Sequence, residues 1–325
     1  MDANVISQPA LVSVILPTYN RPEYLKQALA SVVQQTYRNV EIIVSDNCSP
    51  ENPQALVESF QDTRIRFHRN ETNIEGFPNL VQTFKMSQGK YVASLMDDDI
   101  WEEDFLAKLV PALEANPDLA IAFCDHYIID ENGNIDYPEK EKCSHFYGRN
   151  FLKAGIYQNY YQLAIVKQAI SPAIAAVIRR DAIDWDRIPL EVGSVGDLYL
   201  AYLCCRSGGG AYYVAERLTR YRVHGQTETM LSGDRNAQAK IRKAQSQIFC
   251  YKLFLEDEKI QEFQPYFQRK LFDSYTTLGI GLMRTGQIKE ARAYFWRALK
   301  AQKFNLRTVA ALMLSFTPAS FASRF

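Results

Sequence analysis

The chain has 325 residues with 37 basic and 37 acidic side chains, so its formal net charge is zero. Hydrophobic residues make up 47% and charged residues 23% of the chain, which predicts a folded protein with a buried core. Without an excess of basic residues, binding of nucleic acid through broad neutralisation of phosphates is disfavoured.

The sequence also disfavours a membrane-spanning protein, a secreted protein and a zinc-binding protein. No apolar run reaches the ~18 residues that a membrane span needs. Residues 1–8 lack the basic and apolar regions of a secretory signal. The six cysteines form no CxxC pair, and with four scattered histidines a zinc cluster is not expected. We therefore expect reduced thiols in a cytoplasmic protein.

Strands and helices alternate in the first half of the chain. The apolar run Val12–Leu16 predicts a buried strand, and helical spacing predicts a helix from Pro22 to Val33 with Asn20 as its N-cap. Further strands are expected at 40–44, 65–68, 91–96 and 120–124, and further helices at 53–60, 77–87 and 104–115. This alternation predicts an α/β fold with a mostly parallel sheet covered by helices on both faces.

In the later part of the chain, the alternation of strands and helices gives way to helices. A hairpin turn at Asn132-Gly133, strands at 173–178 and 211–214 and a helix at 195–206 are expected, and helical spacing dominates from about Asn236. We predict an α/β domain over residues 1–233 and an all-α region over residues 234–325.

Three polar clusters follow the predicted strands. They are residues 17–21, Asp46-Asn47 and the triplet Asp97–Asp99. Ligands of open α/β sheets bind at the C-terminal ends of the strands, so we expect these clusters to meet at one edge of the sheet.

The aspartate triplet has two interpretations. Adjacent carboxylates repel one another, and a divalent cation with oxygen ligands relieves that repulsion while it takes its other ligands from substrate phosphates. The alternative is a solvated acidic loop that caps the next helix. Neither a P-loop nor a GxGxxG loop follows the first strand, which disfavours a P-loop kinase and a dinucleotide dehydrogenase.

Three segments together resemble the family 2 glycosyltransferases with the GT-A fold, whose sheet is Rossmann-like. They are VSVILPTYNRPEYLKQALASVVQQTYRNVEIIVSDNCS, NETNIEGFPNLVQTFKMSQGKYVASLMDDDIWEEDFL and VGDLYLAYLCCRSGGGAYYVAERLTRYRVHGQTET. The resemblance covers residues 10 to 230 and implies a nucleotide-binding site in the first two segments. The residues that it implies for this site are Pro17, Thr18, Tyr19, Asn20, Arg21, Asp46, Asn73, Gly76 and Asp97.

The resemblance also implies metal-binding and catalytic residues. Asp98 and Asp99 match the metal-binding acidic motif, although Met96 takes the place of that motif's first carboxylate. His224 matches a position that approaches the metal or the diphosphate in some relatives, and a structural role for it is the alternative. Asp197 matches the catalytic acid, with Gly196 in place of the usual preceding Glu; a helix N-cap is the alternative role for Asp197.

The implied activity is an inverting sugar transfer from a nucleotide-diphosphate sugar to an acceptor hydroxyl in glycan biosynthesis. A UDP-sugar donor, Mn²⁺ or Mg²⁺ as cofactor and a glycan or lipid-linked acceptor are expected with it. The alternatives are a nucleotidyltransferase and a non-catalytic nucleotide-sugar-binding or interaction protein.

The C-terminal region contains one unit with tetratricopeptide-like spacing. Small residues such as Gly279 would let two helices approach, and Phe295 would fill the space between them. This region either packs on the α/β domain or docks a protein. The segment Val309–Phe325 is either core or an interfacial helix that binds peripherally at the inner face of the plasma membrane.

Overall fold

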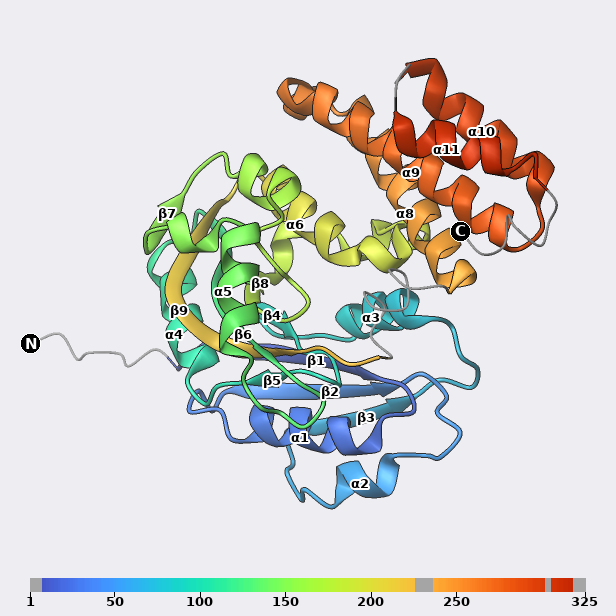
Figure 1. Ribbon diagram of the computed structural model, residues 1–325. Coiled ribbons are helices and arrows are strands. Elements are labelled where there is room, and N and C mark those ends of the chain that lie inside the picture. Colours follow the sequence, from blue (N-terminus) through green and yellow to red (C-terminus); the bar gives the residue numbers. More distant parts are fainter. Residues whose placement is uncertain (1–7, 226–235, 302–304, 318–325) are drawn as a thin grey trace, which may run out of the picture. The chain divides into compact units, whose positions relative to one another are not determined.

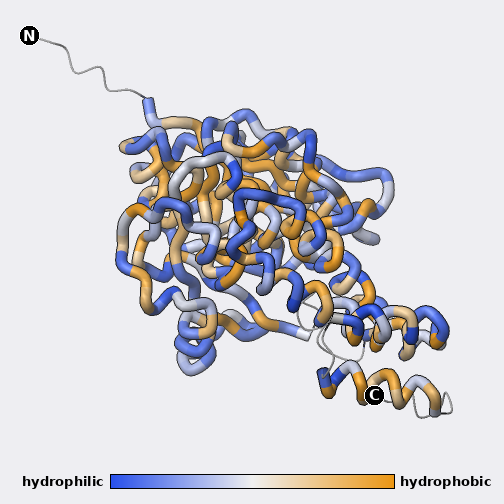
Figure 2. Tube along the Cα trace, turned by 90° about the horizontal axis from the view of Figure 1, so that it is seen from above, coloured by the Kyte–Doolittle hydropathy of each residue, from blue (hydrophilic) through white to orange (hydrophobic). Residues whose placement is uncertain are grey.

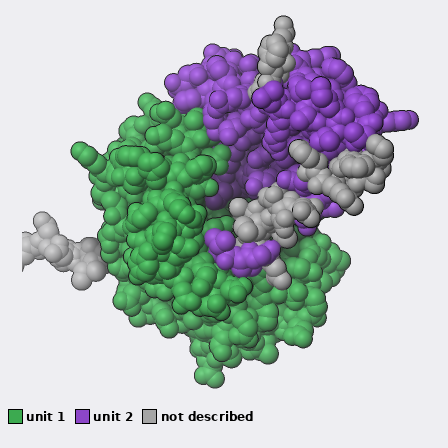
Figure 3. All heavy atoms as spheres, viewed as in Figure 1, with its two compact units in different colours: residues 1–188, 200–222 green, residues 189–199, 223–325 purple. Residues whose placement is uncertain are grey.

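The computed structural model describes residues 8–225, 236–301 and 305–317. These residues divide into two compact units, Met1–Ile188 with Leu200–Arg222 and Pro189–Tyr199 with Val223–Phe325, which Figure 3 colours separately. The α/β fold and the C-terminal helices predicted from the sequence are both present. The second unit also takes in residues 189–199, and the predicted boundary at Gly233 lies outside the described residues.

The first unit is built on a mixed sheet that has nine strands within the described residues (Figure 1). The strands are β1 (Val12–Thr18), β2 (Val40–Asp46), β3 (Ile65–Arg69), β4 (Tyr91–Ser94), β5 (Ile100–Trp101), β6 (Leu119–Ile129), β7 (Gly155–Tyr157), β8 (Ala176–Arg179) and β9 (Gly210–Arg222). Their order is β3-β2-β1-β4-β8-β6-β9-β5, and β7 pairs with β9.

The mostly parallel sheet that the sequence predicts is present. β3, β2, β1 and β4 pair in parallel, and so do β6 and β9, whereas β8 joins the two groups through antiparallel pairs. Val12, Val14 and Leu16 of β1 are fully buried, because parallel strands in the middle of a sheet are covered on both faces.

Helices cover the two faces of the β1–β3 part of the sheet. The helices of the first unit are α1 (Pro22–Val33), α2 (Gln54–Glu58), α3 (Gly76–Lys85), α4 (Phe105–Ala115), α5 (Tyr137–Phe146) and most of α6 (Gly196–Arg206). In Figure 1, α1 and α2 lie on one side of these strands and α3 lies on the other.

One predicted helix cap is wrong. The N-cap of α1 is Arg21, without a side-chain cap, and Asn20 has a positive φ of 54° instead. Pro22 fixes the first helical turn, so α1 begins without a capping side chain. The Asn132-Gly133 turn is confirmed, since Gly133 has a φ of 91° and its N–H donates to the Asp130 carbonyl at 3.1 Å.

The second unit is helical. Its helices are α8 (Ala237–Glu256), α9 (Gln264–Arg284), α10 (Ile288–Ala301) and α11 (Leu306–Leu314), preceded by a short turn, η5 (Leu190–Val195), that packs on α8. Gly279 of α9 lies against Phe295 of α10, as predicted: a Cβ at Gly279 would come within 2.5 Å of the ring. Within the described residues, no helix is both long and apolar enough to cross a membrane.

Candidate active site

The polar residues that follow β1, β2 and β4 meet at one edge of the sheet. The side-chain hydroxyl of Thr18 donates to Asp97 Oδ2 at 2.8 Å, and the backbone N–H of Asn20 donates to Ser49 Oγ at 2.7 Å. β1 lies between β2 and β4 in parallel register, so the three strands end side by side. The predicted convergence of the three clusters is therefore confirmed.

Asp97 and Asp98 both form an ion pair with the guanidinium of Arg21. Arg21 Nη1 lies 3.1 Å from Asp97 Oδ1 and 2.8 Å from Asp98 Oδ2. Asp97 is buried and also accepts the backbone N–H of Tyr19 at 3.2 Å. Burial, and next the neighbouring charge of Asp98, raise the pKa of Asp97 to about 6, while Arg21 acts in the opposite direction.

Asp99 is held by a second arginine, which the sequence analysis missed. The backbone N–H of Arg222, at the end of β9, donates to Asp99 Oδ1 at 2.8 Å, and its Nε donates to the Asp98 carbonyl at 2.7 Å. The guanidinium is buried and reaches the carbonyls of residues 130–131 and the side chain of Gln27. Burial, and next the charge of Asp98, raise the pKa of Asp99 well above its usual range. The only signal in the sequence is that Arg222 stands two residues before His224, because the strand expected at 211–214 ends well before it.

Asp46 is the last residue of β2 and holds the loop that follows this strand. It is fully buried and accepts the backbone N–H of Ser49 at 3.2 Å, the Ser49 hydroxyl, and Arg69 Nη1 at 2.5 Å. Arg69 also donates to the Ser49 carbonyl at 2.7 Å, so the carboxylate and the arginine fix the loop together. The structure thus gives Asp46 a positioning role, and its place in the nucleotide-binding site stays a prediction.

A network of asparagine side chains connects the ends of β2 and β3 to the segment before α3. Asn47 Nδ2 donates to Asn73 Oδ1 at 3.0 Å, and Asn47 Oδ1 accepts from Asn70 Nδ2 at 3.2 Å. Asn73 Oδ1 also accepts the backbone N–H of Glu75 at 2.9 Å. This orders the start of α3 at Gly76, where a Cβ would meet no atom within 4 Å. Asn73 and Gly76 therefore lie beside the Asp46 loop.

Three of the six described non-glycine residues with a positive φ lie on the same loops. Asn20, Cys48 and Glu75 have φ values of 54°, 63° and 72°. Such left-handed conformations are uncommon for residues other than glycine, cost of order 1–3 kcal/mol each, and concentrate at functional sites. Their position on the loops after β1 and β2 and just before α3 agrees with the convergence of polar residues at this sheet edge, which is the candidate site.

Asp197 and His224 belong to the second unit. Asp197 is half-buried in the first turn of α6, where the helix dipole favours its ionised form, and His224 is buried just after β9. Both residues make interactions within the protein. Their catalytic and metal-binding roles stay predictions.

The acidic strand end, by which we mean Asp97–Asp99 just after β4, suits a hard cation, although it does not supply a complete set of metal ligands. Within the described residues, no group of three or more His, Cys, Asp and Glu side chains could hold a metal ion. Asp97 and Asp98 nevertheless hold the positive guanidinium of Arg21 between them. Two carboxylates completed by diphosphate oxygens are a usual arrangement for Mg²⁺.

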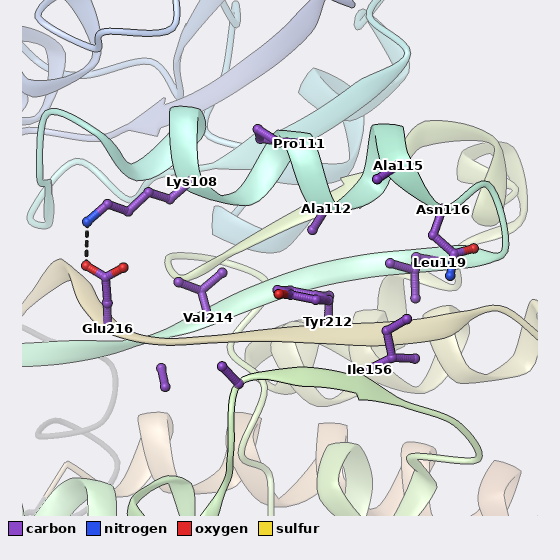
Figure 4. Close-up of a pocket in the computed structure, with 12 residues that line it drawn as sticks. Lys108, Pro111, Ala112, Ala115, Asn116, Leu119, Ile156, Tyr212, Val214 and Glu216 are labelled. Carbon is purple, nitrogen blue, oxygen red and sulfur yellow. Dashed lines mark hydrogen bonds and ion pairs between the residues drawn. The ribbon is translucent and has the colours of Figure 1, made fainter.

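A separate pocket of about 790 Å³ lies elsewhere in the first unit (Figure 4). Residues of α4, β7 and the first half of β9 line it, among them Tyr212 and the ion pair between Lys108 and Glu216. Arg222 and the aspartates lie at the other end of β9, and no residue that the sequence singled out lines this pocket.

Comparisons with known proteins show which proteins this chain resembles. Residues 13–174 match the family model "Glycosyl transferase family 2". The chain is 39% identical over 139 residues to the glycosyltransferase MJ1057 of Methanocaldococcus jannaschii, covering 41% of this chain and 48% of that protein. It is 31% identical over 133 residues to the Escherichia coli UDP-Glc:alpha-D-GlcNAc-diphosphoundecaprenol beta-1,3-glucosyltransferase WfgD, covering 40% of this chain and 52% of that protein. The chain thus spans about half the length of these relatives.

Two solved structures are similar over nearly the whole chain. S. aureus TarS 1-349 in complex with UDP-GlcNAc gives a TM-score of 0.60 at 17% identity, covering 96% of this chain and 87% of that one. The mannosyltransferase PcManGT from Pyrobaculum calidifontis, in complex with GDP-Man and Mn²⁺, gives 0.57 at 18% identity, covering 98% and 84%. At these identities the likeness shows the fold.

Proposed function

The chain belongs to glycosyl transferase family 2 through residues 13–174, and we propose that it transfers a sugar from a nucleotide-diphosphate sugar to an acceptor hydroxyl. The observation that carries this proposal is the acidic strand end, where Asp97–Asp99 meet Thr18, Arg21 and Arg222. It lies within the matched residues except for Arg222, at the sheet edge where ligands of such sheets bind.

The loops after β1 and β2 bind the nucleotide in this proposal. Residues 17–21, Asp46, Asn73 and Gly76 line or order one continuous edge, and Asp97 faces the ribose side of it. A UDP-sugar is the favoured donor, because WfgD is named for UDP-Glc and TarS has been solved with UDP-GlcNAc.

Asp98, supported by Asp99, is the proposed holder of a divalent cation, and His224 is a further candidate ligand. A bound Mn²⁺ or Mg²⁺ would neutralise charge on the departing diphosphate. The Mn²⁺ in the PcManGT structure supports a divalent metal. Arg21 already contacts the carboxylates of Asp97 and Asp98, so its guanidinium would have to give up part of this contact when a cation binds.

Asp197 is the proposed general base. It would take the proton from the acceptor hydroxyl as that oxygen attacks the anomeric carbon, and one base opposite the leaving group implies inversion. A general base contributes about 10²–10⁴-fold to the rate. The acceptor is a glycan or a lipid-linked sugar, and the name of WfgD, which specifies a diphosphoundecaprenol acceptor, supports the lipid-linked class. A cytoplasmic location stays part of the proposal.

A panel of nucleotide-sugars with Mn²⁺ tests this function. Release of nucleoside diphosphate from one donor is expected, and a thermal-shift screen with UDP, GDP, dTDP and CDP identifies the base beforehand. Binding of a donor without turnover, with every acceptor class offered, would support a non-catalytic sugar-nucleotide-binding protein instead. Release of pyrophosphate would indicate a nucleotidyltransferase.

Variants separate the two carboxylate roles. Asp197→Asn should keep donor binding and lose transfer by about 10²–10⁴-fold. The matched control is Glu191→Gln, an exposed carboxylate in the adjoining turn η5, which should leave transfer unchanged. Asp98→Ala should weaken metal-dependent donor binding in calorimetry. Unchanged transfer by Asp197→Asn, or unchanged affinity of Asp98→Ala, would remove that residue from its role.

A further inference from the structure

Positive charge is concentrated in the last helices of the second unit. The described residues from 284 to 317 contain six basic side chains and one acidic side chain, Glu290, a net charge of +5 in a chain whose formal charge is zero. The basic residues are Arg284, Lys289, Arg292, Arg297, Lys300 and Arg307. Such an asymmetry indicates attraction to an anionic surface.

Large apolar side chains are exposed in the same helices. Leu306 is 82% exposed, Met313 67%, Phe316 62% and Trp296 55%. Leu306, Ala310 and Met313 follow one another at helical i, i+4 and i+7 spacing, so they share one face of α11. Figure 2 shows hydrophobic positions recurring along the tube close to the C-terminus.

The opposite face of α11 holds the helix in place. Thr308, Ala311 and Leu312 are buried, and the Thr308 hydroxyl lies 2.7 Å from the Thr276 hydroxyl of α9. The Asn305 side chain caps the helix by accepting the backbone N–H of Thr308 at 3.1 Å. The exposed apolar face is therefore held outward by a packed and capped inner face.

Arg292 joins the exposed parts of α10 and α11. Its guanidinium lies 4.0 Å from the centre of the Phe316 ring and donates to the Ser315 carbonyl at 2.6 Å. Trp296 and Lys300 follow Arg292 at i+4 and i+8, so they continue the same side of α10. We use the name α10–α11 surface for Arg292, Trp296, Lys300, Leu306, Arg307, Met313 and Phe316.

We propose that the α10–α11 surface docks on the headgroup region of an anionic phospholipid bilayer. Such an interface offers acyl chains and, above them, negatively charged phosphates. The exposed apolar side chains would contact the acyl chains, and the lysine and arginine side chains would contact the phosphates. Tryptophan is favoured at this boundary, and long basic side chains extend to the phosphates. A nucleic acid would use the positive charge but leave Leu306 and Met313 without an apolar partner.

Flotation of the full chain with vesicles tests the proposal. We expect binding to phosphatidylcholine vesicles that contain phosphatidylglycerol and little binding to phosphatidylcholine alone. Added salt should weaken the binding, because surface charges are screened. Equal binding to both vesicles, or none to either, would overturn the proposal.

Two variants and their controls locate the contact. The double variant Leu306→Gln/Met313→Gln should reduce vesicle binding about tenfold or more, since both side chains are exposed and the fold does not need them. Arg307→Gln should reduce it about fivefold. The matched controls are Phe146→Gln, which removes an 80% exposed ring in α5, and Lys142→Gln in the same helix; both should bind like the parent chain.

Two further measurements distinguish membrane docking from donor binding and from self-association. The thermal shift with nucleoside diphosphate should be the same in all four variants, because the α10–α11 surface is not part of the proposed donor site. Sedimentation velocity tests whether a second copy covers the surface. Self-association that Leu306→Gln/Met313→Gln abolishes would overturn membrane docking, while a failed donor screen would leave it standing.

Discussion

The backbone N–H of Arg222 donates to Asp99 Oδ1 at 2.8 Å, joining the end of the longest described strand to the acidic triplet. The same residue donates through its side chain to the Asp98 carbonyl at 2.7 Å and stacks over Tyr24, 4.6 Å from the ring centre. One buried arginine thus fixes the loop on which both proposed metal-binding carboxylates stand.

Replacement of Arg222 by lysine should therefore disturb the acidic strand end. Lysine keeps the charge but cannot reproduce the forked donation to several carbonyls. We expect Arg222→Lys to lower the free energy of unfolding by about 2–3 kcal/mol and to weaken metal-dependent donor binding. Urea unfolding and calorimetry measure the two effects. Arg187→Lys, whose parent side chain is 88% exposed, is the control and should change neither; parent-like unfolding of Arg222→Lys would contradict its proposed role.

Arg21 gives a prediction about metal affinity. Its guanidinium and a divalent cation would compete for the carboxylates of Asp97 and Asp98. Arg21→Met should thus raise the affinity for Mn²⁺, measured without nucleotide by electron paramagnetic resonance, by about tenfold. The control is Arg66→Met, which breaks an ion pair of 2.8 Å with Glu41 away from the aspartates. An Arg21→Met affinity no higher than that of Arg66→Met would show that the two cations do not compete.

The sequence predicted well those elements that depend on local pattern. β1, β2 and β4 are short apolar runs followed at once by polar residues, so their positions and the meeting of their C-terminal ends could be inferred before any coordinates. Gly279 against Phe295 was predictable for a similar reason, because both lie in one helical pair with a recognisable spacing.

Features that depend on distant partners were not predictable. Residues 211–214 were predicted as a strand, but β9 continues to Arg222 through charged residues that the apolar pattern does not mark. Arg220 is held by Glu102 at 2.7 Å, a residue 118 positions earlier, and Arg222 has partners as distant as Gln27. Tertiary ion pairs stabilise this strand, and the spacing of a single sequence does not show them.

A buried histidine outside the candidate site should make stability depend on pH. Arg149 Nη2 lies 3.1 Å from Nε2 of His126. Burial is the main cause that lowers the pKa of His126 to about 3, and the positive charge of Arg149 is the second cause. The unfolded chain takes up a proton near pH 6.5 and the folded chain does not. The free energy of unfolding therefore falls as pH drops from 6.5 towards 3, by about 1.4 kcal/mol per pH unit from this group.

Comparison with a variant isolates this contribution. Urea unfolding at pH 7.5 and pH 5.5 should show a loss in the parent chain that is larger by about 1 kcal/mol than in His126→Gln, because other groups titrate equally in both. His145→Gln, which replaces an imidazole in α5, is the control for the substitution of another histidine in the same unit. An identical slope in His126→Gln would mean that this imidazole takes up its proton equally in the folded and the unfolded chain, which would contradict the lowered pKa.

The contact between α9 and α10 should tolerate no side chain at Gly279. A Cβ there would come within 2.5 Å of the Phe295 ring, which is fully buried. Gly279→Ala should therefore destabilise the helical unit by about 1–3 kcal/mol, although alanine is the better helix former. Circular dichroism during thermal unfolding measures this loss.

Gly286→Ala, at a position with open space but a φ of 82°, is a control for backbone strain alone. Phe295→Leu should make room for the new methyl group, so the double variant should lose less than the two single losses added together. Additive losses would show that the ring does not oppose the methyl group.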